Sequence, residues 1–323
     1  MLGTSVSNET RLRTVGDLVS VVIPTFCGAT TLPELISRIL KSEWWETDNE
    51  IILVDDGNTD DTWPVICAIT ASTPQVHGIR LARNFGQHAA LLAGIRLARH
   101  DICVTLDDDL QNPPEEIGEL LGALSNFDVV YGIPRNRKQT LLRKSLSRLS
   151  KLVLRYSLGY EHATSISSFR AFRTSLRNGF AENLGPGISL DSLLNWSTSR
   201  FGTVRVEHHE RKSGRSNYSS RSLFRFLIDC ATGYSVRPLR VATNIGLGTI
   251  TISFCVFLWV LGRAMLFGSS VPGFPFLVAL ISMLSGTQLV LLGVLGQYIG
   301  HMHFRVMNRP TYVILEQTKA PRK

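Results

Sequence analysis

Short apolar runs alternate with segments of helical spacing between residues 18 and 131, and this alternation constrains the fold more than any other feature. The runs are rich in β-branched residues and short enough to be buried strands. The expected strands are 18–24, 50–54, 78–82, 101–106 and 128–131, and the expected helices are 31–40, 60–69, 88–99 and 113–124. Strands and helices that alternate at this spacing predict an α/β fold with a mostly parallel sheet.

Two acidic clusters stand where two of these strands end. Residues 55–57 read Asp-Asp-Gly and follow the strand 50–54, and three aspartates at 107–109 follow the strand 101–106. Ligands of open α/β sheets bind at the carboxyl ends of the strands. We therefore expect both clusters at one edge of the sheet, where they would line a binding site.

The cluster of Asp107, Asp108 and Asp109 predicts a site for a divalent cation. Three adjacent carboxylates repel one another unless a cation lies among them. Alternate residues of an extended segment point to the same side, so Asp107 and Asp109 can face one point with Gln111 nearby, while the Asp108 side chain points the other way. Oxygen ligands of this kind suit Mg²⁺ or Mn²⁺. The alternative is a solvated acidic turn.

The formal net charge of +8 suits an anionic partner, and several basic residues could face the phosphates of a ligand. Arg135 and Arg137 follow the strand 128–131, and Arg211 and Ser216 lie in a flexible basic loop. Guanidinium groups match phosphate oxygens in geometry and charge. Basic loops are common, so this pattern only supports the site that the aspartates predict.

Two long apolar stretches lie near the C-terminus. Residues 244–266 contain one charge, Arg263, and residues 274–299 contain none. Each stretch is long enough for a transmembrane helix, which needs roughly 20 residues. The short connector 267–273 predicts a helical hairpin, with a buried core hairpin as the alternative. Basic residues flank the hairpin and are nearly absent from the connector, so the positive-inside rule predicts that both termini are cytoplasmic.

These features divide the chain into five parts. They are a polar N-terminal extension at 1–17, a cytoplasmic domain at 18–220, a juxtamembrane interfacial helix at 221–240, two transmembrane helices at 241–300 and a cytoplasmic tail at 301–323. A basic segment at 135–155 has helical spacing and predicts an amphipathic helix that faces either solvent or a membrane surface. The five cysteines form no CxxC pair, which argues against a disulfide framework or a zinc site.

Seven segments together resemble a known family. They are VVIPTF at 21–26, VDDGNTDDT at 54–62, RNFGQHAALLAGI at 83–95, LDDDLQNPPEE at 106–116, FRAF at 169–172, ERKSGRSNYS at 210–219 and GQYIGHMHFRVMNRPTYVI at 296–314. Their order resembles the family-two glycosyltransferases that act on polyprenyl phosphates. This group includes dolichol-phosphate mannose synthase and the undecaprenyl-phosphate glucose and aminoarabinose-type transferases. The resemblance covers about residues 18–315.

The resemblance implies a GT-A fold and an enzyme at the inner, cytoplasmic membrane. It implies inverting transfer of a sugar from a nucleotide diphosphate donor, with a UDP-sugar favoured, to undecaprenyl or another polyprenyl phosphate for cell-envelope glycan or lipid modification. The implied donor-binding residues are Pro24, Thr25, Phe26, Asp55, Asp107, Asp108, Arg135, Arg137, Arg211 and Ser216. The implied metal ligands are Asp109, Gln111 and Asp107, and the implied catalytic residues are Asp107, Asp109 and Arg211.

The chain departs from the family pattern at three places. Phe26-Cys27-Gly28 replaces the usual Tyr-Asn-Glu, Ser168 stands where relatives often carry an acidic residue, and Asn217 replaces a lysine. These departures put the base and sugar specificity in doubt. The proposed nucleophile is a lipid phosphate oxygen that is already ionised at pH 7, so no strong general base is needed. Asp191 could orient this acceptor.

Other functions remain as alternatives. The departures motivate a catalytically silent membrane scaffold of the same fold. A processive polysaccharide synthase needs more membrane spans and usually a Gln-x-x-Arg-Trp segment, which this chain lacks. A nucleic-acid partner is not expected, because lipid and phosphate substrates explain the basic residues and no row of aromatic side chains accompanies them. The resemblance also allows a homo-oligomer.

Overall fold

The computed structural model describes residues 17–135, 166–180, 189–209, 274–307 and 310–318, together with scattered residues between 243 and 266. The chain divides into two compact units. The first comprises residues 1–147, 161–217 and 310–323, and the second comprises 148–160 and 218–309. The candidate site lies in the first unit, which is built on one sheet.

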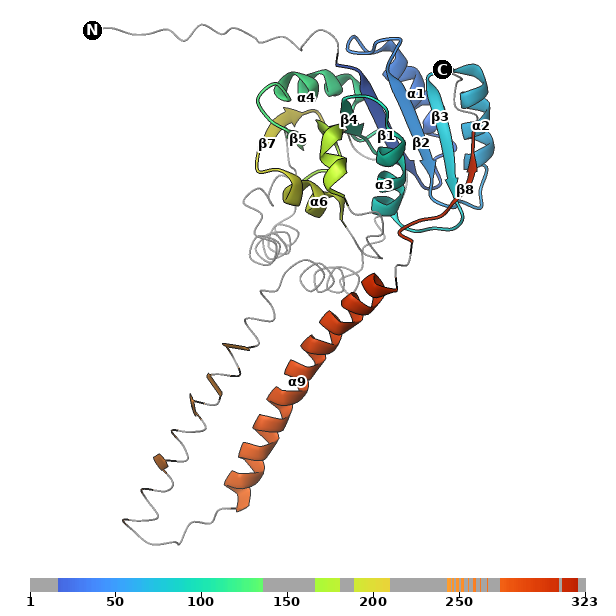
Figure 1. Cartoon of the computed structure of the whole chain (residues 1–323). Helices are drawn as coiled ribbons and strands as arrows, with labels where there is room; N and C mark the ends of the chain where they lie inside the picture. Colours follow the sequence, from blue (N-terminus) through green and yellow to red (C-terminus); the bar gives the residue numbers. More distant parts are fainter. Residues whose placement is uncertain are drawn as a thin grey trace, which may run out of the picture. The chain divides into compact units, whose positions relative to one another are not determined.

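The described strands form a single eight-stranded sheet in the order β7-β5-β6-β4-β1-β2-β3-β8 (Figure 1). The strands are β1 Val19–Thr25, β2 Glu50–Asp55, β3 Val76–Leu81, β4 Ile102–Thr105, β5 Val129–Pro134, β6 Arg170–Arg173, β7 Phe201–Val206 and β8 Ile314–Gln317. Neighbouring strands pair in parallel, except that β6 is antiparallel to β4 and β5 and β8 is antiparallel to β3. The expected mostly parallel sheet is therefore confirmed.

Helices cover both faces of this sheet. They are α1 Leu32–Lys41, α2 Thr62–Ser72, α3 Gln87–Leu97, α4 Ile117–Ala123 and α6 Leu190–Ser197, with short 3₁₀ turns η1 Pro114–Glu116 and η2 Thr174–Gly179. Val21 and Ile23 of β1 pack in one core with α1, α2 and α4. Val22 points the other way, where it approaches Gly94 of α3. This alternation explains why β1 is apolar at nearly every position, because both of its faces are covered.

The elements predicted before residue 131 are all present, and their boundaries differ from the expected ones by at most three residues, except that α4 begins at Ile117, four residues later than expected, after the turn η1. The apolar spacing of α1 is an example. Leu32, Leu35, Ile36 and Ile39 are all buried, as one face of an amphipathic helix requires. A proline in the first turn of α1 costs no hydrogen bond there.

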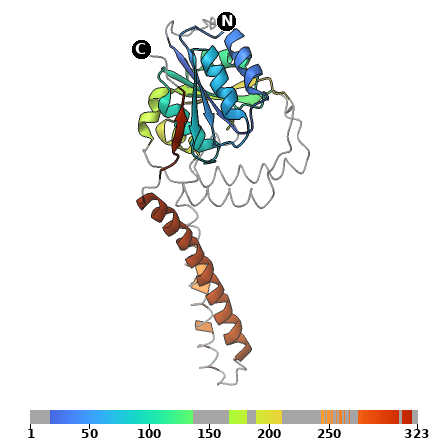
Figure 2. The ribbon, with the colours of Figure 1, turned by 90° about the vertical axis from the view of Figure 1, so that its right-hand side faces the viewer.

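The strand β8 was not predicted. The sequence analysis treated 301–323 as one tail, whereas the structure adds residues 314–317 to the free edge of β3, within the first unit. Figure 2 shows β8 in red with the blue helices of this unit. Thr318 extends the pairing, since its backbone N–H donates to the carbonyl of Gly78 at 2.9 Å. The strand β8 has four residues, of which one is partly buried and three are exposed. This is too short an apolar pattern to be recognised as a strand in the sequence.

The second unit contains α9, Phe274–Val306, which includes the whole of the predicted second apolar span. In the part of the chain that the structure describes, no helix combines the length and hydropathy of a membrane span. The predicted interfacial helix at 221–240 and the basic segment after Arg135 lie outside the described residues. The transmembrane hairpin thus stays a prediction.

Candidate functional site

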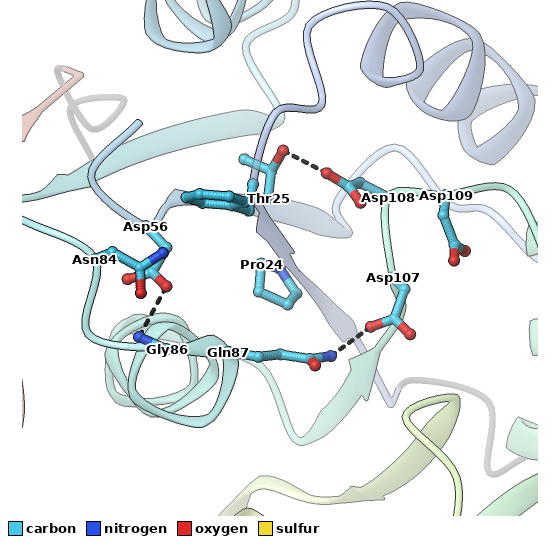
Figure 3. Close-up of a pocket in the computed structure, with 10 residues that line it drawn as sticks. Pro24, Thr25, Asp56, Asn84, Gly86, Gln87, Asp107, Asp108 and Asp109 are labelled. Carbon is cyan, nitrogen blue, oxygen red and sulfur yellow. Dashed lines mark hydrogen bonds between the residues drawn. The ribbon is translucent and has the colours of Figure 1, made fainter. Parts of the chain in front are cut away.

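A pocket of about 300 Å³ opens at the carboxyl ends of β1, β2, β3 and β4 (Figure 3). Its lining residues are Pro24, Thr25, Phe26, Asp56, Asn84, Gly86, Gln87, Asp107, Asp108 and Asp109. The parallel pairing of β1 with β2 and β4 brings these strand ends together. The two acidic clusters therefore meet at one edge of the sheet, as the sequence predicts.

Asp107 is held by hydrogen bonds from two sides. Its Oδ1 accepts from the Gln87 side-chain amide at 2.7 Å, a contact visible in Figure 3. Its Oδ2 accepts from the Ser168 hydroxyl at 2.5 Å. Ser168 is itself placed by Thr105, whose hydroxyl donates to the Ser168 carbonyl at 2.7 Å. Two neutral donors thus orient the Asp107 carboxylate at the pocket.

The Asp108 side chain turns in a different direction from that of Asp107, as expected, and it still lines the pocket. The carboxylate turns toward the end of β1 and accepts a hydrogen bond from the Thr25 hydroxyl at 2.5 Å (Figure 3). The nearby backbone N–H of Phe26 also favours the ionised form of this carboxylate. Burial raises the Asp108 pKa to about 6; the Thr25 bond opposes the rise, and the charges of Asp107 and Asp109 add to it.

Asp109 lines the pocket at the start of a tight turn. Its Oδ1 accepts from the backbone N–H of Gln111 at 3.2 Å. Leu110, between them, has a φ of 58°, a left-handed conformation that is costly for a residue with a branched side chain. The turn carries Gln111 away, and Gln111 is not among the residues that line the pocket.

The three aspartates do not converge on one point. Among the residues that the structure describes, no group of three His, Cys, Asp or Glu side chains is placed to hold a metal ion. The cause lies in their partners, since Asp107 turns to Gln87 and Ser168 while Asp108 turns to Thr25. The predicted metal ligands Asp107, Asp109 and Gln111 therefore stay a prediction.

At the end of β2, Asp56 rather than Asp55 faces the pocket. Asp55 is buried, and its Oδ1 accepts from the backbone and side-chain N–H groups of Asn58 at 2.9 and 2.8 Å. Its Oδ2 lies 3.5 Å from Arg80 Nε. Burial raises the Asp55 pKa, and the bonds from Asn58 and the charge of Arg80 oppose that rise.

Asp56 anchors the loop that forms the far wall of the pocket. Its two carboxylate oxygens accept from the backbone N–H groups of Phe85 and Gly86 at 2.8 and 2.9 Å. Gly86 has a φ of 92°, which favours glycine. Sequence reasoning missed Asp56, Asn84, Gly86 and Gln87 as site residues. The only signal for the last three was the RNFGQH segment of the family resemblance.

The turn after β1 forms the opposite wall. Pro24 and Thr25 end the strand, and the Phe26 ring that follows is 58% exposed. Cys27 has a φ of 60°, and its backbone N–H donates to Asn58 Oδ1 at 3.1 Å. Pro24, Thr25 and Phe26 therefore line the pocket as the resemblance implies.

Of the predicted phosphate-binding residues the structure describes Arg135, which does not line the pocket. Arg135 Nη2 lies 3.7 Å from Glu116 Oε2, and its Nε donates to the carbonyl of Arg205 at 3.1 Å. Arg137, Arg211 and Ser216 lie outside the described residues, as does Asn217. The backbone N–H of His209 donates to the Gln111 carbonyl at 2.8 Å, so the chain leaves β7 alongside the acidic turn just before the segment with Arg211.

Asp191 is part of a buried ion pair and not a pocket residue. Its carboxylate accepts from the Tyr131 hydroxyl at 2.9 Å and from the Arg170 guanidinium. Arg170 Nε also donates to the Thr105 hydroxyl at 3.1 Å. The expectation that Asp191 orients an acceptor is not supported, because Asp191 serves as the counter-charge of a buried arginine.

Sequence comparison finds relatives along almost the whole chain. The family model for glycosyl transferase family 2 matches residues 20–180. An undecaprenyl-phosphate 4-deoxy-4-formamido-L-arabinose transferase from Pseudomonas paraeruginosa is 36% identical over 309 residues, which cover 94% of this chain and 91% of that protein. The transferase of the same name from Shewanella sediminis is 34% identical over 304 residues, 92% of each chain.

Structural comparison finds the same fold in a more distant enzyme. Glucosyl-3-phosphoglycerate synthase from Mycobacterium tuberculosis, crystallised with Mn²⁺, UDP and glucosyl-3-phosphoglycerate, aligns with a TM-score of 0.52 at 19% identity. The alignment covers 73% of this chain and 86% of that one. The likeness supports the expected GT-A type of α/β fold.

Proposed function

Because this chain belongs to glycosyl transferase family 2, we propose that it is an inverting glycosyltransferase that moves a sugar from a nucleotide diphosphate donor to a polyprenyl phosphate. The observation that carries the proposal is the match to undecaprenyl-phosphate transferases over 94% of the chain. That match extends well beyond the part with the pocket and includes both apolar stretches. The acceptor is then undecaprenyl phosphate or a close analogue, used for cell-envelope glycan or lipid modification.

The pocket suits the nucleotide part of the donor. The exposed Phe26 ring offers a surface on which a base can stack. Gly86 and Gln87 begin α3 at the opposite wall, and the N-terminal end of a helix favours negative charge such as a diphosphate. We favour a UDP-sugar as donor, since the M. tuberculosis enzyme of this fold was crystallised with UDP.

The side-chain oxygens of Asp107, Asp109 and Gln111 are of the kind that a divalent cation binds, although Gln111 does not line the pocket. All three side chains offer oxygen ligands, which Mg²⁺ and Mn²⁺ prefer. Asp107 and Asp109 already line the pocket, and Gln87 and Ser168 orient the first of them. The bound cation would neutralise charge on the departing diphosphate. The Mn²⁺ of the M. tuberculosis enzyme supports this part of the proposal.

Different residues of the chain would have different roles in the sugar transfer. Asp56 holds the loop 84–87 that faces the nucleotide. Arg211 is the candidate for stabilising the leaving diphosphate, with Arg137 and Ser216 as further phosphate ligands. Arg135 is engaged with Glu116 and is a weaker candidate. The lipid phosphate oxygen attacks the anomeric carbon without a general base, because it is ionised at neutral pH.

The acceptor requires access to a membrane, and the apolar stretches 244–266 and 274–299 would supply it as a transmembrane hairpin. The charge distribution around them supports a catalytic domain and two termini on the cytoplasmic side of the inner membrane. A soluble, short-chain acceptor phosphate should then be used less efficiently than undecaprenyl phosphate.

A donor screen tests the proposal. The purified full-length chain is incubated with undecaprenyl phosphate, Mg²⁺ or Mn²⁺, and a set of UDP- and GDP-sugars, and lipid-linked product is measured. Asp109→Ala should lower transfer by at least about 100-fold, because charge stabilisation at the leaving group is lost. Asp101→Ala is the matched control, since this exposed carboxylate lies at the other end of β4.

Each contrary result has a definite meaning. Turnover by Asp109→Ala at the wild-type rate would contradict the metal assignment. No product with any donor would favour the silent scaffold. A product that carries many sugars would indicate a processive synthase instead of single transfer.

A further inference from the structure

We propose that Asp108 is a positioning residue that latches the turn after β1 to the end of β4, and that Gly28 is required to leave space for its carboxylate. The effect that we expect on donor binding rests on the proposed function. The latch itself is a property of the fold and can be tested separately.

The latch is visible in the contacts of Asp108. Its Oδ2 accepts from the Thr25 hydroxyl at 2.5 Å, and the nearby Phe26 backbone N–H also favours the ionised carboxylate. Thr25 is the last residue of β1, and Asp108 follows β4. A hydrogen bond to one partly buried carboxylate thus joins the ends of two neighbouring strands, as Figure 3 shows.

Gly28 is packed against this carboxylate. A β-carbon at position 28 would lie 2.4 Å from Asp108 Oδ2 and 2.2 Å from Thr25 Oγ1. Both distances are far below van der Waals contact, so any other residue at 28 must displace Asp108, Thr25 or the backbone. The φ angle of Gly28 is not in the positive region that favours glycine. The reason for glycine here is therefore space and not backbone conformation.

The turn that Asp108 latches carries Phe26 into the pocket. From the other side, Asn58 holds the same turn, because its Oδ1 accepts from the Cys27 N–H and its Nδ2 donates to the Thr25 carbonyl at 3.2 Å. Cys27 has the left-handed φ of 60°, a strained conformation that persists only when the surroundings hold it. Without Asp108 the turn would lose its side-chain bond to the end of β4, and Phe26 would be held less firmly.

The same contacts separate Asp108 from its two neighbours. Asp107 and Asp109 face the pocket and are the proposed ligands of the cation, whereas Asp108 turns its oxygens to β1. We therefore assign the middle aspartate to the nucleoside side of the site. Its loss should weaken nucleotide binding through Phe26 and leave the cation requirement nearly unchanged.

The first experiment is a mutant cycle on the full-length chain, read by thermal unfolding. Gly28→Ala and Asp108→Ala should each lower the midpoint. In the Asp108→Ala background, Gly28→Ala should cost far less, because the Thr25 hydroxyl has lost its partner and can rotate away from the new methyl group. Equal cost in both backgrounds would overturn the latch, since residues without contact act additively.

The second experiment measures the dissociation constant of UDP in the presence of Mn²⁺, and the donor KM and kcat in the transfer assay. Asp108→Ala and Thr25→Val should each weaken UDP binding by about threefold to tenfold, the usual range for one buried hydrogen bond. The donor KM should rise while kcat changes less. The Asp108→Ala/Thr25→Val double variant should be no weaker than Asp108→Ala.

Thr25→Val separates the effect of the Thr25–Asp108 bond from the effect of the Asp108 charge, because it removes the bond and keeps the carboxylate. Weaker UDP binding by Asp108→Ala but not by Thr25→Val would overturn the proposal, as would a higher Mn²⁺ requirement in Asp108→Ala without a change in UDP affinity. If the wild type binds neither UDP nor GDP, the proposed function fails, and the unfolding cycle alone then decides the latch. A Gly28→Ala chain that does not fold unless Asp108→Ala is also present would support it.

Discussion

Ser168 contributes a hydroxyl to the site where relatives often carry an acidic side chain. Its Oγ donates to Asp107 Oδ2 at 2.5 Å, and the Gln87 amide donates to the other oxygen of that carboxylate at 2.7 Å. A carboxylate at 168 would face the Asp107 carboxylate at this distance and repel it. The serine is therefore compatible with an oriented Asp107, and this departure does not by itself argue for an inactive chain.

Ser168→Ala should lower kcat/KM for the donor by about threefold to tenfold, because Asp107 loses the hydrogen bond from the Ser168 hydroxyl. The Mn²⁺ concentration needed for half-maximal rate should rise by a similar factor. Ser125→Ala is the control, since that hydroxyl bonds only locally to the Gly122 carbonyl on an exposed turn. Wild-type kinetics in Ser168→Ala would show that Gln87 alone orients Asp107.

The sequence located the acidic clusters but could not say which aspartate of each faces the pocket. Asp56 was missed in favour of Asp55, and the bond that the Asp108 side chain makes to Thr25 was not foreseen. In both cases the direction depends on where the strand ends, because successive side chains of a strand point to opposite sides. Which way each of two adjacent side chains points is decided by contact partners that lie far away in the sequence. Here these partners are Arg80 for Asp55 and Thr25 for Asp108.

At the scale of elements, β8 links the C-terminal part of the chain to the nucleotide-binding sheet. Glu316 of this strand accepts from the Trp63 indole at 3.0 Å and from Arg80 Nη1 at 3.2 Å. Arg80 in turn lies 3.5 Å from Asp55 Oδ2, an oxygen for which the described residues offer no hydrogen-bond donor. Glu316 in β8, a strand that follows α9 along the chain, thus holds Arg80. Arg80 in turn is the positive charge beside the buried Asp55 carboxylate in β2.

Glu316→Ala should lower the free energy of unfolding by about 1 kcal/mol, because the Trp63 bond and a partly exposed ion pair are lost together. In an Arg80→Ala background the loss should be smaller, since the two residues are in contact. Denaturant unfolding of the full-length chain measures both values. Leu315→Ala, an exposed position on the same strand, serves as control, and an equal loss there would refute the specific role of Glu316.

The elements that sequence reasoning found and missed differ in a physical way. The first strands are buried on both faces and read as continuous apolar runs, as in β1 and β2, where every residue is buried. By contrast, the missed strands β7 and β8 carry exposed positions and lie at the two edges of the sheet, and the missed interior strand β6 has only four residues. Edge strands need fewer apolar residues, so composition marks them weakly.

For the molecule as a whole, the α/β class and the place of the site followed from the strand–helix alternation alone, whereas the chemistry depended on the family resemblance. The reason is that strand-end geometry gathers polar residues in any open α/β sheet, and only the particular motifs connect them to nucleotide sugars. The membrane hairpin rests on hydropathy and charge distribution and remains a prediction.

The stability of the first unit should depend on pH through Glu50, a buried carboxylate that joins three elements. Its Oε1 accepts from the Ser20 hydroxyl and the Arg99 backbone N–H, both at 2.7 Å, and its Oε2 accepts from the Arg99 guanidinium. Burial raises the Glu50 pKa, but these hydrogen bonds and the Arg99 charge outweigh it, so the net pKa lies below the usual 4.5. His77 and His100 also face it, at 3.7 and 4.0 Å.

A carboxylate whose pKa is lowered by folding adds stability above its unfolded pKa, and this stability is lost as the pH falls through the folded value. Glu50→Gln should therefore be less stable than the wild type at pH 7 by about 1.5–3 kcal/mol, because a charged acceptor is lost. Below pH 4.5 the difference should shrink, and it should vanish once the pH falls below the lower pKa of the folded wild-type carboxylate, which is then protonated as well. Unfolding midpoints between pH 7 and 3.5 measure this convergence, with the exposed Glu43→Gln as control. Parallel curves for Glu50→Gln and the wild type would mean that Glu50 ionises alike in the folded and unfolded chain, contrary to its place between Ser20 and Arg99.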